Sequence, residues 1–136
     1  MKKKPNFSIC FIGRNESAVL QRALDSLKEF KERDGEICYL DTGSTDNTVQ
    51  IAKDFGCKTG EAGEEFIIKV TKEQADGVNK RFLVEGEEPI LTEGGKLFDF
   101  ASARNACADR LATNPMVAWL DCDEKYTVLD IDAICK

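Results

Sequence analysis

Two aspartates separated by a single residue are the clearest candidates for chemistry in this sequence. Asp121 and Asp123 directly follow an apolar run, residues 116–120, that is typical of a buried strand. Where a strand leaves a sheet in extended form, both carboxylates point to the same side and repel one another unless a proton or a cation lies between them. A hard divalent cation with so few protein ligands keeps coordination sites for water and phosphate oxygens. The D-x-D pattern therefore predicts a site for Mg²⁺ or Mn²⁺ on a nucleoside diphosphate.

The 136 residues include no histidine, and its absence excludes several kinds of catalysis. Ser-His-Asp and Cys-His nucleophiles, histidine-bound zinc and imidazole proton shuttles all need that side chain. Chemistry must then come from carboxylates, hydroxyls, thiols or a hard metal ion. The six cysteines form no Cys-x-x-Cys pair and several lie in apolar runs, so we expect buried, reduced thiols rather than a disulfide framework.

The charge balance and the apolar runs restrict the partners and the location. Asp and Glu number 25 against 19 Lys and Arg, for a net charge of −6, and an acidic chain repels the phosphate backbone of nucleic acids. No apolar run approaches the roughly 18–20 residues that a membrane-spanning helix requires. We therefore expect a cytoplasmic protein with no transmembrane segment and no nucleic-acid polymer as its partner.

The elements that must position the aspartates alternate between strand and helix. Apolar runs predict buried strands over residues 7–12 and 37–40, and apolar residues at three- and four-residue spacing predict a helix over 17–30. A second helix should end at Gly56, and a third is predicted over residues 99–112. The apolar run over residues 116–120, which precedes the aspartates, is expected to form a third central strand. Strands joined by such helices pair in parallel, which indicates an α/β sheet.

A segment rich in glycine and acidic residues interrupts this order. We expect one domain over residues 1–136 with an inserted rim segment at 61–96. Within that segment, residues 66–70 and 89–92 are candidate strands, and Thr71-Lys-Glu-Gln74 has the form of a capping box that begins a short helix.

Polar clusters follow three of the predicted strands. They are Arg14-Asn15-Glu16, residues 41–46 and residues 121–124. Ligands of parallel α/β sheets bind beyond the carboxyl ends of the strands, where loops expose helix N-termini and backbone amides. We therefore expect the three clusters to meet at one crevice.

Four blocks of this sequence resemble, in the same order, those of the family two inverting glycosyltransferases. The blocks are residues 8–16, 40–48, 98–105 and 119–124. The resemblance implies a Rossmann-like GT-A sandwich, an α/β fold whose mainly parallel central sheet is flanked by helices. It also implies a nucleotide diphospho-sugar as donor, UDP- or GDP-linked, with Mn²⁺ or Mg²⁺ as cofactor and transfer to an acceptor with inversion.

The resemblance implies roles for the residues at the nucleoside end of that ligand. Asp41 would contact the base, while Arg14, Asn15 and Glu16 would lie along the base and ribose. Many members carry a second acidic residue where this sequence has Thr42, which leaves the base contact and the choice of nucleotide open.

At the diphosphate end, the resemblance implies roles for three charged residues. Arg104 would approach the base or the phosphates, and Asp121 would face the ribose and diphosphate. Asp123 would ligate the metal that bridges the diphosphate, and the carboxylate of Asp121 is the second candidate ligand.

The general base and the acceptor-binding elements of the family lie beyond the D-x-D block. This chain ends at Lys136, and the nearby carboxylates are poor candidates for the base. Glu124 belongs to the D-x-D block itself, and Asp130 is expected to cap a helix over residues 131–134. We therefore expect a fold truncated after the D-x-D strand, without an identified base, acceptor or oligomeric state. A non-catalytic module that binds nucleotide sugars without turnover is the alternative.

Two further interpretations remain as alternatives from other classes. Asp41-Thr-Gly-Ser44 after an apolar strand matches the active-site turn of retroviral-type aspartic proteases, in which two such aspartates share a proton. That family is nearly all β, and the helical patterns on both sides of Asp41 contradict it. A phosphotransferase with an aspartyl nucleophile in the D-x-D block fits less well with the position of these aspartates at the end of a strand.

Overall fold

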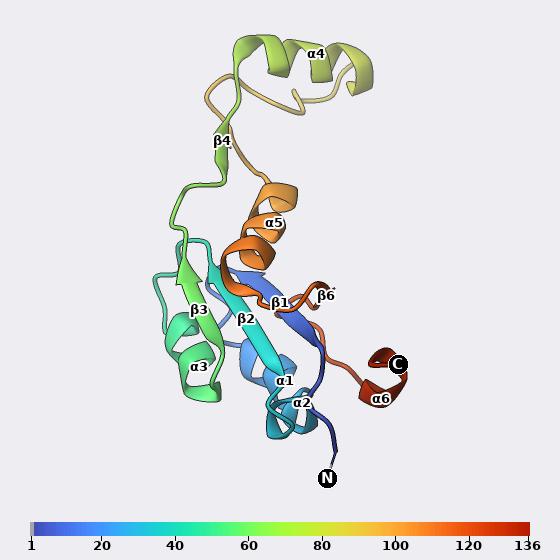
Figure 1. Ribbon diagram of the computed structural model, residues 1–136. Coiled ribbons are helices and arrows are strands. Elements are labelled where there is room, and N and C mark those ends of the chain that lie inside the picture. Colours follow the sequence, from blue (N-terminus) through green and yellow to red (C-terminus); the bar gives the residue numbers. More distant parts are fainter. Residues whose placement is uncertain (1) are drawn as a thin grey trace. The chain divides into compact units, whose positions relative to one another are not determined.

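The computed structural model describes residues 2–136, which form two compact units (Figure 1). The larger unit combines residues 2–65 with residues 101–136, and the smaller unit is residues 66–100. The larger unit contains every polar cluster that the sequence analysis assigned to a strand end.

A parallel four-stranded sheet forms the centre of the larger unit. This confirms the predicted α/β class and the predicted strands. Two features differ from the expectation. The strand before the D-x-D block was expected to be central, but it lies at an edge of the described sheet. An unpredicted strand forms the other edge. In spatial order the strands are β3 (Lys58–Glu61), β2 (Glu36–Asp41), β1 (Phe7–Gly13) and β6 (Met116–Trp119).

Helices cover both faces of this sheet (Figure 1). Three lie on one face, and their apolar side chains pack against β1 and β2. One lies on the opposite face, where the thiol of Cys107 donates a hydrogen bond to the carbonyl of Phe11 at 3.3 Å. The helices on the first face are α1 (Leu20–Asp25), α2 (Lys28–Glu32) and α3 (Thr48–Phe55), and the helix on the opposite face is α5 (Phe100–Leu111).

The core lies between the sheet and the face formed by α1, α2 and α3. Phe7, Ile9 and Phe11 of β1 are fully buried, and the period-two alternation of a strand places all three on this face of the sheet. The Phe7 ring packs on Phe30 of α2 with 5.1 Å between the ring centroids. Each such side chain contributes about 1.5–3 kcal/mol through burial. This core holds the carboxyl ends of the strands in place.

The single helix predicted over residues 17–30 is wrong, because the structure has α1 and α2 there, separated at Ser26 and Leu27. The Ser26 hydroxyl donates to the carbonyl of Ala23 at 2.6 Å, a local bond that competes with the helical ladder. The same hydroxyl accepts the backbone N–H of Tyr126 at 3.1 Å. A contact across the fold therefore stabilises the break.

Two predicted helix boundaries are confirmed. Gly56 ends α3 in the left-handed conformation, with φ of 94°, which glycine adopts without strain. Asp130 caps α6 (Ile131–Ile134), since its carboxylate accepts the N–H of Ala133 at 3.0 Å.

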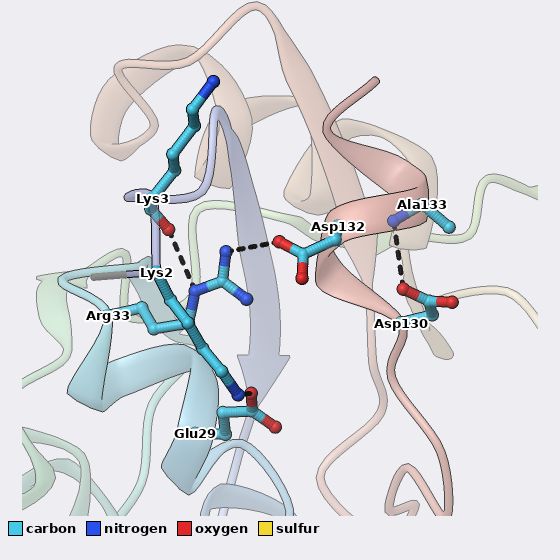
Figure 2. A network of polar contacts seen from close by, with 7 residues as sticks. All are labelled: Lys2, Lys3, Glu29, Arg33, Asp130, Asp132 and Ala133. Atoms are coloured by element: carbon cyan, nitrogen blue, oxygen red, sulfur yellow. Dashed lines mark hydrogen bonds and ion pairs between the residues drawn. The ribbon is translucent and has the colours of Figure 1, made fainter.

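Figure 2 shows how Arg33 connects this C-terminal helix to the rest of the unit. Its guanidinium binds the carboxylate of Asp132 at 2.7 Å.

The smaller unit pairs two short antiparallel strands, β4 (Ile67–Lys69) and β5 (Lys96–Phe98). Its helix α4 (Lys72–Phe82) begins with the predicted capping box of Thr71 and Gln74. The strand predicted over residues 89–92 is wrong. The Asn79 side chain instead binds the backbone of that segment, accepting N–H groups from Ile90 and Leu91 and donating to the Leu91 carbonyl.

The six cysteines are free, and four of them are buried, as predicted. No helix within residues 2–136 combines the length and the apolar character needed to cross a bilayer.

Candidate functional site

The first two predicted clusters begin side by side at the carboxyl edge of the sheet. Gly13, the last residue of β1, lies opposite Asp41, the last residue of β2. Thr42 continues the contact, since its backbone N–H and its hydroxyl both donate to the Gly13 carbonyl, at 2.9 and 3.1 Å. Thr42 is buried, so its side chain holds the two strand ends together.

Asp41 is 3% exposed, and its carboxylate accepts four hydrogen bonds. One oxygen accepts the hydroxyls of Tyr39 and Ser44 at 2.7 and 2.6 Å. The other accepts the backbone N–H groups of Gly43 and Ser44 at 3.1 and 2.7 Å. Burial, followed by the hydrogen bond to Asp41, raises the pKa of Tyr39 above its ordinary value. The Asp41 carboxylate thus organises the turn that follows β2, and a contact of this residue with a base stays a prediction.

Asn15 joins the loop after β1 to this turn. Its φ of 53° is in the left-handed region, which asparagine tolerates better than most residues. Its backbone N–H donates to the Ser44 hydroxyl at 2.9 Å, and its side-chain oxygen accepts the N–H of Thr45 at 2.7 Å. One position further, the Glu16 N–H donates to the hydroxyl of Thr48 at 2.9 Å. The exposed side chain of Arg14 therefore stands on a loop that is fixed on both sides.

The D-x-D block forms a turn, which corrects the extended geometry expected for it. The N–H of Glu124 donates to the carbonyl of Asp121 at 3.0 Å, and the Glu124 carboxylate accepts the N–H of Asp121 at 3.0 Å. Arg22 of α1 donates to the carbonyl of Asp123 at 2.8 Å. Both aspartates are exposed, and the residue between them is buried. The turn therefore still presents the two carboxylates to solvent.

Cys122, the middle residue of the block, packs beneath the other strand ends. It is 3% exposed, and its thiol lies 3.5 Å from the carbonyl of Ile12. A Cβ on Gly13 would lie 2.8 Å from this sulfur and 3.0 Å from the Tyr39 hydroxyl. Only glycine allows so close an approach, so Gly13, Cys122 and Tyr39 form one packed contact between three strand ends.

Burial and negative charges from all three clusters act on the Cys122 thiol. Burial is the largest cause that raises the pKa of its thiol to about 12. The remaining causes are the negative charges of Glu16, Asp121, Asp123 and Asp41. Each of the three clusters therefore contributes at least one negative charge that raises the pKa of this thiol.

Arg104 connects α5 to the D-x-D turn. Its guanidinium binds the carboxylate of Asp121 at 3.1 Å, with the two side chains 40% and 55% exposed. An ion pair this exposed contributes little stability. It borders a pocket of about 300 Å³ that is lined by Arg104, Trp119, Asp121 and Glu124. Trp119 begins the block over residues 119–124, but its residue type alone does not mark it as a site residue, because an aromatic residue at a strand end is usually part of the core.

The exposed carboxylates of Asp121 and Asp123 fit a hard cation by their chemistry, since Mg²⁺ and Mn²⁺ prefer oxygen ligands. Within residues 2–136, no three histidine, cysteine or acidic side chains gather closely enough to enclose a metal ion. The donor set therefore suits an ion held by one or two carboxylates and completed by phosphate oxygens.

The fold of the chain is similar to solved GT-A glycosyltransferase structures. A crystal structure of S. aureus TarS, residues 1–349, matches with a TM-score of 0.54 and 19% identity, over 88% of this chain and 28% of that one. The glucosyl-3-phosphoglycerate synthase of Mycobacterium tuberculosis, in complex with Mn²⁺, uridine diphosphate and glucosyl-3-phosphoglycerate, matches with a TM-score of 0.51 and 20% identity. That match covers 89% of this chain and 36% of the synthase, so the chain spans about a third of the length of these structures.

Sequence comparisons gave one match. No curated protein sequence is significantly similar to the chain. The family model described as glycosyl transferase family 2 matches residues 8–80, which is more than half of the 136 residues and includes the clusters that follow β1 and β2. The chain therefore belongs to glycosyl transferase family 2.

Proposed function

We propose that the larger unit binds a nucleotide diphospho-sugar, UDP- or GDP-linked, together with Mn²⁺ or Mg²⁺. As part of a complete enzyme it would transfer the sugar to an acceptor with inversion, as the family resemblance implies. One observation carries the proposal: β2, β1 and β6 are parallel neighbours, and at their carboxyl ends Gly13 packs against both Cys122 of the D-x-D turn and Tyr39, whose hydroxyl binds Asp41. Ligands of parallel α/β sheets bind at this edge.

Asp123 and Asp121 are the proposed ligands of the metal ion. When bound, the ion would stabilise the negative charge that develops on the departing diphosphate. Asp121 also accepts a hydrogen bond from Arg104, so the guanidinium stands where it can approach the phosphates. TarS crystallised with UDP, and the M. tuberculosis synthase with Mn²⁺ and UDP, supply precedents within the same fold.

The nucleoside end of the ligand is proposed to lie on the loops after β1 and β2. Arg14, Asn15 and Glu16 belong to the first loop, and its hydrogen bonds to Ser44 and Thr45 hold it against the second. Asp41 contributes to nucleoside binding mainly by organising the turn after β2. Fixed loops reduce the conformational entropy that a ligand must overcome on binding.

Binding without turnover is the second candidate. Both carboxylates near the D-x-D block that could serve as a general base already have a structural role. Glu124 accepts the backbone N–H of Asp121, and Asp130 caps α6. A chain with this site and no other base would bind a donor sugar and not transfer it.

Calorimetry with UDP and GDP, each with and without Mn²⁺, tests the proposal, and a hydrolysis assay with the corresponding nucleotide sugars runs beside it. Nucleotide binding that requires the metal supports the site. Turnover in addition supports the enzyme, and binding with no turnover supports the second candidate. Failure of both nucleotides to bind with Mn²⁺ contradicts the proposal.

A further inference from the structure

Trp119 places a partly exposed aromatic ring beside the D-x-D turn. It is the last residue of β6 and is 38% exposed, and it lines the 300 Å³ pocket beside the D-x-D turn. Ala118, its neighbour on the strand, packs against the core on the side of α1, α2 and α3. Because successive side chains of a strand point to opposite faces, Trp119 lies on the face covered by α5, from which Arg104 reaches the same pocket.

The pocket combines an aromatic surface with charged groups that accept and donate hydrogen bonds. The indole of Trp119 provides the surface, while the carboxylates of Asp121 and Glu124 and the guanidinium of Arg104 surround it. A hexose ring matches this arrangement, because its C–H faces are apolar and its edge carries hydroxyls. The negative face of an aromatic ring attracts such polarised C–H groups. A nucleobase would also stack on an indole, so position must distinguish the two.

The order of the strands distinguishes them. The proposed nucleoside end lies on the loops after β1 and β2, while Trp119 ends β6, on the far side of β1. Neighbouring strands lie ~4.8 Å apart, so β2 and β6 are separated by about 10 Å across the sheet. In addition, Trp119 lies opposite Cys10, three residues before the Gly13 that lies opposite Asp41. A ligand whose base contacts the first loops must extend over the D-x-D turn before it reaches Trp119. We infer that the indole of Trp119 contacts the donor sugar ring, a conclusion that rests on the proposed function.

The experiment compares nucleotides with nucleotide sugars. Binding of UDP, GDP, UDP-glucose and GDP-mannose is measured by calorimetry with Mn²⁺, for the wild type, Trp119→Ala and Trp119→Phe. Met116→Ala is the matched control, since Met116 belongs to the same strand and is 44% exposed, but its side chain points to the other face. Trp119 is the only tryptophan, so its fluorescence reports directly on the pocket.

We expect Trp119→Ala to weaken binding of the nucleotide sugar by about tenfold and binding of the bare nucleotide by less than about twofold. Trp119→Phe should retain most of the affinity, and Met116→Ala all of it. Fluorescence of the wild type should change more with the nucleotide sugar than with the nucleotide alone.

Equal losses for nucleotide and nucleotide sugar would place the indole against the base and overturn the inference. Unchanged affinity of Trp119→Ala for both, or nucleotide sugars that bind the wild type no more tightly than nucleotides, would also overturn it. These results leave the proposed function standing, because the nucleotide still binds. Only a wild type that binds no nucleotide with Mn²⁺ removes the proposed function and the inference together.

Discussion

The residue between the two aspartates determines how the D-x-D turn is held. Cys122 is buried against the carboxyl end of β1, while Asp121 and Asp123 remain exposed on either side. Its packing partners are Gly13 and the Tyr39 hydroxyl, and that hydroxyl binds the Asp41 carboxylate at 2.7 Å. A substitution at this contact is therefore expected to affect both the D-x-D turn and the turn after β2.

Gly13→Ala tests this contact. The new Cβ would lie 2.8 Å from the Cys122 sulfur, so we expect the free energy of unfolding to fall by about 1–3 kcal/mol. Denaturant unfolding measures the change. In the Cys122→Ala background, the same substitution should cost less, because the nearest of the three atoms close to the new Cβ has been removed. An equal cost in both backgrounds would show that Cys122 is not the obstacle.

The carboxyl of Asp46 provides a prediction about pH. Hydrogen bonds from the Thr48 side chain, with smaller contributions from Ser17, lower its pKa from 3.8 to about 2. Because the pKa is lower in the folded state, these bonds stabilise the loop fully above about pH 4 and are lost as the pH falls through about 2.

Carbon-detected NMR titration of Asp46 should give a midpoint near 2. Thr48→Val removes the hydroxyl and should move the midpoint up toward the ordinary value for aspartate. A wild-type midpoint near 4, or no shift in the variant, would contradict the hydrogen-bonding account.

Among the elements, α2 contributes to the core chiefly through Phe30. Its ring is fully buried against Phe7, and a Cβ on Gly35 would lie 2.4 Å from it. The turn between α2 and β2 thus closes tightly over this ring. Packing of one aromatic residue compensates for the shortness of a helix that would be marginal alone.

Phe30→Ala should lower the free energy of unfolding by about 3–5 kcal/mol, because it removes a fully buried ring and leaves a cavity. Phe82→Ala is the matched control, since that ring is 62% exposed on α4 and its loss should cost less than about 0.5 kcal/mol. Thermal and denaturant unfolding measure both variants. Similar costs for the two would contradict the assigned core.

Helix ends could be predicted from the sequence where nearby residues determine them. Gly56, Asp130 and the Thr71 capping box each end or begin a helix where expected. The break between α1 and α2 could not be found in this way. It depends on a hydrogen bond between Ser26 and Tyr126, which are a hundred residues apart in sequence.

At the scale of the whole molecule, the alternation of strand and helix was enough to predict the parallel sheet. The polar clusters follow the carboxyl ends of β1, β2 and β6, and a crevice shared by all three stays a prediction. The edge strand β3 was not predicted, because the segment Lys58–Glu61 is polar and short and pairs only through its backbone with β2.

For the candidate site, the sequence predicted where the charged residues lie, and their roles in binding stay predictions. Charged residues that follow strands can be recognised in a sequence by their type and spacing. The close packing of Gly13 on Cys122, and the exposure of Trp119, are properties of the assembled strand ends and leave no pattern in the sequence.

The central claim is that the D-x-D turn holds a divalent cation on which a nucleoside diphosphate binds. Calorimetry of UDP and GDP with Mn²⁺ on Asp123→Ala tests it most directly, with Asp109→Ala, an exposed aspartate of α5, as the matched control. We predict that Asp123→Ala loses metal-dependent binding while its unfolding midpoint stays unchanged, since an exposed carboxylate contributes little stability. Nucleotide binding with Mn²⁺ that is as tight in Asp123→Ala as in the wild type would contradict the claim.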